Sequence, residues 1–162
     1  ILSRVRFMAQ ALECKWIFVD HLSILVSGQD EGDERKSIDV LMTKLRSLVE
    51  QTGIGMLLVS HLRRPAGDRG HEDGKEITLS HLRGSASIAH LSDGVIGLER
   101  NQQDTDEVKA NTTTLRILKN RYTGDTGIAT HLHYNKETGR MKEIDNPYEV
   151  DYNTENNEEV PF

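Results

Sequence analysis

Two short apolar segments separated by one long helical pattern constrain the fold of this chain more than any other feature. Residues 16–19 (Trp-Ile-Phe-Val) end at Asp20, and residues 54–60 end at His61. Neither segment alternates polar and apolar side chains, which is typical of a parallel strand buried on both faces. A strand, a helix and a second strand in that order predict a right-handed parallel crossover, and therefore an α/β fold.

The helical pattern between these strands begins at Asp33 or Glu34 and should stop at Gly53, because glycine commonly ends a helix. A second helical pattern covers residues 2–12. Residues 79–91 are predicted to form a helix or a broken helix. The apolar positions of the central helix are Ile38, Leu41, Met42, Leu45, Leu48 and Val49.

The second half of the chain has the pattern of a β-sheet. Residues 94–99 form a third apolar run, while residues 113–121 and 128–134 alternate polar and apolar side chains. The sequence Gly-Asp-Thr-Gly at 124–127 predicts a turn, so the two alternating segments should pair as an antiparallel hairpin. Residues 140–143 are expected to add an edge strand.

Charge is distributed unevenly along the 162 residues. The last twenty residues hold seven acidic and no basic side chains, so the net charge of −6 leaves residues 1–142 at +1. We therefore expect residues 1–145 to form one domain and residues 146–162 to be an acidic disordered tail. No apolar run approaches the roughly 20 residues of a membrane helix, and the single Cys14 suits a reducing compartment. A cytoplasmic location without a membrane partner is the expectation.

Five sequence blocks, in order, resemble a known family. Together they resemble the RecA-like motor domain of DnaB-type ring-shaped replicative DNA helicases, most closely that of the primase-helicases of lytic phages. The resemblance covers nearly the whole chain and implies a RecA-like parallel sheet flanked by helices, with the antiparallel hairpin as a carboxyl-terminal extension. The blocks are Trp-Ile-Phe-Val-Asp-His (16–21), Leu-Leu-Val-Ser-His-Leu (57–62), Leu-Arg-Gly-Ser (82–85), Leu-Ser-Asp (91–93) and Leu-Lys-Asn-Arg-Tyr-Thr-Gly-Asp-Thr-Gly (118–127).

The resemblance implies a site for ATP or dTTP at the strand ends. Asp20 takes the Walker B position, where a carboxylate helps to hold Mg²⁺ through its bound water. His61 takes the position of a γ-phosphate sensor, although a histidine at a strand end is by itself more often structural. Arg121 resembles an arginine finger that reaches the nucleotide of the neighbouring subunit, with assistance from Lys119. Without the family, Arg121 would be read as an ordinary exposed base of the hairpin.

The remaining site residues follow from the same resemblance. Arg100 and Tyr134 take positions that sandwich the nucleobase, which suits their flat surfaces. His90 stands where the family has a glutamine that links nucleotide state to the DNA loop. Phosphates of single-stranded DNA would be contacted by the loop at 63–76 and the segment after it, in a way that is independent of base sequence. The DNA-binding residues expected there are Arg63, Arg64, Arg69, Arg83 and Gly84.

Phe162 would anchor the acidic tail on the replicative DNA polymerase, although such tails also serve simply to keep proteins soluble. The chain has no Gly-x-x-x-x-Gly-Lys-Ser/Thr phosphate loop, since its only Gly-Lys pair precedes Glu76. We therefore expect it to be part of a longer hexameric helicase that moves on single-stranded DNA, and to be inactive alone. The alternative is a RecA-like module that binds DNA or assembles rings without hydrolysing nucleotide.

Overall fold

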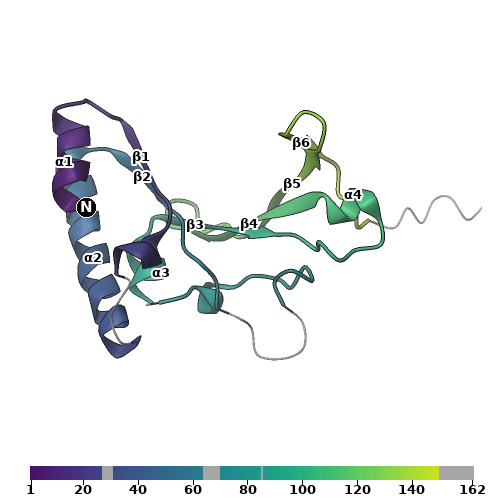
Figure 1. The fold of residues 1–162 in the computed structure, drawn as a ribbon, viewed down its shortest axis with the longest axis horizontal. Coiled ribbons are helices and arrows are strands. Elements are labelled where there is room, and N and C mark those ends of the chain that lie inside the picture. The colour runs from purple at the N-terminus through teal and green to yellow at the C-terminus, as the bar shows by residue number, and fades with distance from the viewer. Residues whose placement is uncertain (27–30, 64–69, 85, 150–162) are drawn as a thin grey trace, which may run out of the picture.

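The computed structural model describes residues 1–26, 31–63, 70–84 and 86–149 (Figure 1). Helices α1 and α2 lie beside a pair of parallel strands, and a four-stranded antiparallel sheet extends away from them to α4. No helix within these ranges is long and apolar enough to cross a lipid bilayer.

The first half of the chain confirms the predicted unit of strand, helix and strand. β1 and β2 pair in parallel, with Trp16 opposite Gly55 and Val19 opposite Leu58. Helix α2 connects them and begins slightly earlier than the sequence predicts. The elements are α1 (Leu2–Gln10), β1 (Trp16–Val19), the 3-10 helix η1 (Leu22–Leu25), α2 (Glu31–Thr52) and β2 (Gly55–Leu58).

The second half confirms the predicted hairpin, the edge strand and the broken helix. Its four strands form one antiparallel sheet in the order β3-β4-β5-β6. The side chain of Asp106 caps α4 by accepting from the amides of Val108 and Lys109. The elements are η2 (Leu79–His81), α3 (Ser87–Leu91), β3 (Gly94–Glu99), α4 (Glu107–Ala110), β4 (Thr112–Asn120), β5 (Gly127–Asn135) and β6 (Arg140–Ile144).

Buried side chains of α2 belong to two clusters, one within the first half and one that also includes α3. Toward its carboxyl end, Leu48 packs with Val5 of α1 and Ile17 of β1. Toward its amino end, Ile38 packs with Ile88 of α3 and with η1. The predicted apolar stripe of the helix is confirmed at helical spacing, because Leu45 is buried and the other members lie in or against these clusters.

The sheets differ from the prediction in two ways. The sequence predicts β1 to be buried on both faces, which is wrong for the described residues: Ile17 is 3% exposed, whereas Trp16 is 64% and Phe18 73% exposed. One face of the pair packs on α1 and α2, while the other lacks a covering element in the part described. β3 also pairs with β4 and not with β1 or β2, so a single RecA-like parallel sheet stays a prediction.

The start of the predicted tail lies against the sheet. Residues 146–149 are described, and the ring of Tyr148 lies 5.8 Å from that of His131 on β5. Phe162 and the rest of residues 150–162 lie outside the described ranges.

Candidate functional site

Three polar residues, Asp20, His21 and His61, lie where the pairing of β1 and β2 ends. Asp20 follows β1 directly, and its exposed carboxylate has no hydrogen-bond partner among the described residues. The rings of His21 and His61 stack with their centroids 4.0 Å apart and an interplanar angle of 31°. The amide of Val59 donates to the carbonyl of Val19 at 2.9 Å, which extends the strand pairing to this point. Asp20 and His61 therefore follow the carboxyl ends of two paired parallel strands, an edge where α/β proteins commonly bind ligands.

The Asp20 carboxylate fits one ligand of a hydrated Mg²⁺ ion. In phosphate sites Mg²⁺ is usually held by one or two carboxylates together with water and the phosphates themselves. Within the described ranges no group of three or more histidine, cysteine, aspartate or glutamate side chains could hold a metal. Asp20 can therefore bind a metal only together with ligands from a nucleotide, from water or from parts of the protein outside the described residues.

A short antiparallel ladder places two candidate DNA-binding arginines beside His61. The amide of Arg83 donates to the carbonyl of His61 at 2.9 Å. The amide of Arg63 donates to the carbonyl of His81 at 2.8 Å, and its Nε donates to that of Leu82 at 3.1 Å. Both arginines are exposed. The ladder thus joins the candidate phosphate sensor directly to the candidate DNA surface.

Gly84 has a structural reason to be glycine. Its φ of +110° lies in the left-handed region, and a Cβ placed on it would lie 2.5 Å from Cδ1 of Ile38 in the core. The predicted role of Gly84 at DNA stays a prediction. Two further candidate DNA-binding residues, Arg64 and Arg69, lie outside the described ranges.

A buried carboxylate fixes the chain that follows the candidate DNA loop, and sequence reasoning did not identify it. Glu99 at the end of β3 is 8% exposed and accepts from the amide of Ile77 at 2.8 Å. It also accepts from Nε of Arg116 at 2.7 Å and from Nη2 at 3.2 Å. This pairing, chiefly the hydrogen bond to Glu99, raises the pKa of the Arg116 guanidinium. Glu76 lies 3.3 Å from Nη1 of the same arginine.

Two histidines, His71 of the candidate DNA loop and His81 of η2, pack against each other. The rings of His71 and His81 meet edge to face, with their centroids 5.2 Å apart. The amide of Thr78 donates to Nδ1 of His81 at 3.3 Å, and Nε2 of His71 lies 3.0 Å from the carbonyl oxygen of Arg63. Burial, and then the charges of His71 and Lys75, lower the pKa of His81. The neutral imidazole of His81 is therefore favoured.

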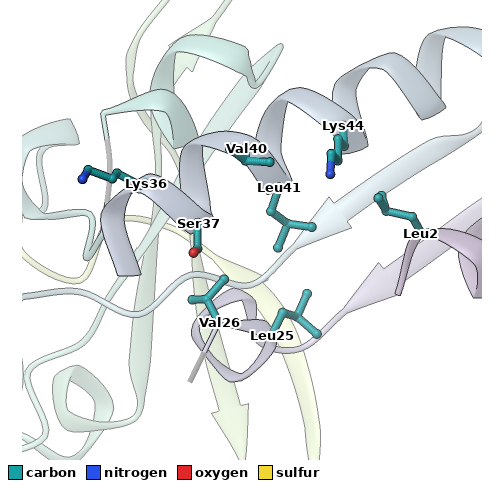
Figure 2. A pocket seen from close by; sticks show the side chains of 8 residues that line it. All are labelled: Leu2, Leu25, Val26, Lys36, Ser37, Val40, Leu41 and Lys44. Atoms are coloured by element: carbon teal, nitrogen blue, oxygen red, sulfur yellow. The ribbon is translucent and has the colours of Figure 1, made fainter. Parts of the chain in front are cut away.

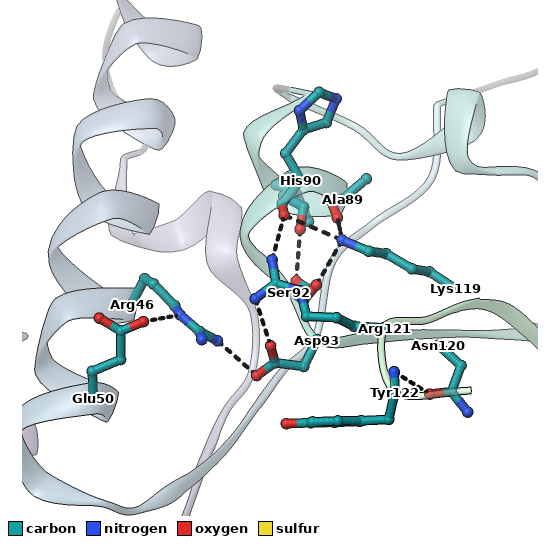
Figure 3. Close-up of polar contacts among 11 residues, drawn as sticks. Arg46, Glu50, Ala89, His90, Ser92, Asp93, Lys119, Asn120, Arg121 and Tyr122 are labelled. Carbon is teal, nitrogen blue, oxygen red and sulfur yellow. Dashed lines mark hydrogen bonds and ion pairs between the residues drawn. The ribbon is translucent and has the colours of Figure 1, made fainter. Parts of the chain in front are cut away.

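Arg121 lies directly after β4 at a corner built from β4, α3 and α2 (Figure 3). Its side chain is 44% exposed; Nη1 lies 3.0 Å from Oδ1 of Asp93, and Nη2 donates to the carbonyl of His90 at 3.3 Å. The other oxygen of Asp93 lies 2.6 Å from Nη1 of Arg46, which also pairs with Glu50. The hydrogen bond to Asp93, and then that to Glu50, raises the pKa of Arg46.

Lys119 binds the end of α3 in its own chain. Its Nζ donates to the carbonyls of Ala89 at 2.6 Å, His90 at 3.1 Å and Ser92 at 2.8 Å. These bonds use all three ammonium donors and satisfy carbonyls that a helix end leaves without partners. The imidazole of His90 points away from this cluster, so its contact with Lys119 and Arg121 is through its main chain (Figure 3). The catalytic role of Lys119 and the coupling role of His90 stay predictions.

The side chain of Arg100 and the main chain of Tyr134 both bond to Asn111, a residue that sequence reasoning did not single out. Arg100 donates from Nε to the carbonyl of Ala110 at 2.7 Å and from Nη2 to Oδ1 of Asn111 at 3.1 Å. The amide of Tyr134 donates to the carbonyl of Asn111 at 2.9 Å. These residues lie at the start of the nine-residue strand β4, whereas Arg121 follows its end. At ~3.4 Å per residue the two places are roughly 30 Å apart.

A shallow hollow lies away from all of these residues, between α1, η1 and α2 (Figure 2). Aliphatic side chains form most of its wall. No candidate site residue lines it. The lining residues are Leu2, Leu25, Val26, Lys36, Ser37, Val40, Leu41 and Lys44.

The chain is similar to known helicases. Residues 1–143 match the family described as the DnaB-like helicase C terminal domain. The chain is 45% identical over 142 residues to a DNA helicase/primase of Enterobacteria phage T3, covering 88% of this chain and 25% of that protein. It is 27% identical over 125 residues to a probable plasmid replicative DNA helicase of Chlamydia psittaci, covering 77% and 26%. It is 28% identical over 90 residues to the replicative DNA helicase DnaB of Treponema pallidum (strain Nichols), covering 56% and 19%. The chain therefore spans about a quarter of these relatives or less.

Proposed function

Because this chain belongs to the DnaB-like helicase C-terminal domain family, we propose that it is part of the motor of a replicative DNA helicase. In the whole protein the motor would form a hexameric ring, hydrolyse ATP or dTTP, move on single-stranded DNA and separate the duplex. Its acidic tail would contact the replicative DNA polymerase, and the protein would work in the cytoplasm.

The observation that best supports this proposal is that Asp20 and His61 lie at the same edge of the strand pair. Asp20 directly follows β1, and the ring of its neighbour His21 stacks on that of His61, three residues after β2. An exposed carboxylate and an exposed imidazole at this edge suit a metal-bound triphosphate, the carboxylate orienting the water shell of Mg²⁺ and the imidazole donating to the γ-phosphate. Bound Mg²⁺ would offset the negative charge of the β- and γ-phosphates.

The ladder that joins His61 to Arg83 would couple the state of the bound nucleotide to the contacts with DNA. The carbonyl of His61 binds the amide of Arg83, and Arg63 lies on the same ladder. A shift of His61 on release of phosphate would therefore move the backbone that carries both arginines. Such arginine contacts to DNA phosphates would be independent of base sequence and sensitive to salt.

Arg121 and the pair formed by Arg100 and Tyr134 would serve two different nucleotides. The base site and Arg121 lie at opposite ends of β4. One subunit would therefore stack a base between Arg100 and Tyr134, while its Arg121 would contact the phosphates of the nucleotide bound by the neighbouring subunit. An arginine supplied to a phosphoryl-transfer site from another subunit increases the rate by about 10³-fold or more.

The test uses the full-length protein and its DNA-stimulated hydrolysis of ATP and dTTP. Arg121→Ala subunits are mixed into wild-type rings in increasing proportion. We expect each variant subunit to remove more activity than its share, because it leaves a neighbouring site incomplete and stalls the ring. A Lys136→Ala subunit, altered at an exposed base that pairs with Glu107, is the control and should have no such effect. A loss proportional to the share of Arg121→Ala, or an inactive wild-type protein, would favour the alternative of a module without turnover.

A further inference from the structure

The carboxylate of Asp93 lies between two guanidinium groups that come from distant parts of the chain. Oδ2 is 2.6 Å from Nη1 of Arg46 on α2, and Oδ1 is 3.0 Å from Nη1 of Arg121 after β4 (Figure 3). The carbonyl of Asp93 also accepts from the amide of Arg121 at 2.8 Å. Both the main chain and the side chain of Arg121 are thus fixed by one residue.

These contacts hold Arg121 in place without engaging all the N–H donors of its guanidinium. A carboxylate that faces one arginine commonly makes two parallel bonds to it, but here the second oxygen is taken by Arg46. Among the described residues, the side-chain bonds of Arg121 to Asp93 and His90 use two of the five N–H donors of a guanidinium. Three donors remain for a ligand.

The charge of the corner remains positive. Arg46 and Arg121 pair with the carboxylates of Asp93 and Glu50, and Lys119 binds the nearby carbonyl of Ser92, which leaves one positive charge in the cluster. A phosphate would therefore still be attracted to Arg121 while Asp93 holds it. An unrestrained arginine would lose side-chain entropy on being fixed at a phosphate. Fixing it beforehand removes part of that cost.

We propose that Asp93, shared with Arg46, is a positioning residue that holds the Arg121 guanidinium at the subunit surface ready for the phosphates of a nucleotide bound by the neighbouring subunit. This inference rests on the proposed function of Arg121. Asp93 itself need not touch the nucleotide.

The test compares hydrolysis by full-length rings that carry Asp93→Asn in two backgrounds. With Arg121 present, the variant should lower kcat by about tenfold and change the KM for nucleotide by less than about twofold, because orientation and not binding is lost. With Arg121→Ala already present, Asp93→Asn should lower kcat no further. The matched control is Glu50→Gln, which removes the other partner of Arg46 without touching Arg121 and should leave kcat unchanged.

The outcomes distinguish the positioning role of Asp93 from the proposed function of Arg121. If Asp93→Asn lowers kcat equally in both backgrounds, its role is only structural and the inference is wrong; an unchanged kcat also overturns it. If Arg121→Ala itself leaves kcat intact, the proposed function of Arg121 fails instead. Should Asp93→Asn prevent ring assembly, Asp93→Glu, which keeps the charge and displaces it by one methylene, is expected to show the same dependence on Arg121.

Discussion

Replacing Glu99 by glutamine tests how the segment after the candidate DNA loop is fixed to the sheet. Glu99→Gln keeps the size of the side chain but removes the charge that faces the Arg116 guanidinium. The pair is largely buried, with Glu99 8% and Arg116 18% exposed, so water replaces little of the lost interaction. The amide of Ile77 also depends on this carboxylate.

The expected loss of stability is about 2 kcal/mol. Removing one partner of a fully buried ion pair costs about 3–5 kcal/mol, because the other charge stays buried without compensation. Arg116 is partly accessible and keeps Glu76 at 3.3 Å, which reduces the cost. For a domain of this size, 2 kcal/mol corresponds to roughly 4–8 °C in Tm.

Urea unfolding and the Tm of the chain measure this loss, and hydrogen exchange at the Ile77 amide reports the local effect. The control is Glu76→Gln, which removes a 65% exposed partner of the same arginine and should cost less than about 1 kcal/mol. If the Glu99 variant is as stable as this control, or if Ile77 stays equally protected, the buried network does not hold the segment.

Three further predictions follow from the structure. Gly84→Ala should lower the free energy of unfolding in urea by about 2–4 kcal/mol, because Gly84 has a positive φ and the side chain of Ile38 lies close to it. An unchanged urea midpoint would contradict this backbone conformation of Gly84. The pKa of His81 is lowered in the folded chain. As the pH falls below about 6.5, the unfolded chain therefore binds more protons at His81 than the folded chain does, and the free energy of unfolding should decrease. In His81→Gln this part of the pH dependence should be absent; a wild-type midpoint that rises on acidification would refute the sign. Tyr134→Ala in the full-length protein should raise the KM for nucleotide roughly tenfold and affect kcat less, since base stacking contributes about 1–3 kcal/mol, and an unaltered KM would remove Tyr134 from the base site.

Local patterns in the sequence predict most of the elements. The period of α2, the alternation in β4 and β5 and the glycine turn between them depend on near neighbours, and the structure confirms them. What covers a strand is not a local property. Trp16 and Phe18 are as apolar as Ile17, yet they lie on the face of β1 that has no cover within the described residues.

The polar contacts of the site show the same limit. Asp93 and Arg46 are 47 positions apart, and Asp93 and Arg121 are 28 apart, so no sequence spacing joins them. Glu99 reads as the polar end of an apolar run, and only the fold shows that it is buried with Arg116. Asp20 and His61 were predictable because each directly follows an apolar run in the sequence.

The central claim is that Asp20 of one subunit and Arg121 of its neighbour act on the same nucleotide. The most direct measurement mixes full-length Asp20→Asn protein with full-length Arg121→Ala protein, each strongly impaired alone, and follows nucleotide hydrolysis without DNA. Without a strand to move along, an incomplete site does not stall the ring, and each interface can hydrolyse nucleotide independently. In random equal mixtures about one interface in four would join an intact Asp20 to an intact Arg121, so hydrolysis should rise above that of either protein alone. If both residues serve a nucleotide within one subunit, every site lacks one of them, and the mixture will hydrolyse nucleotide no faster than its components.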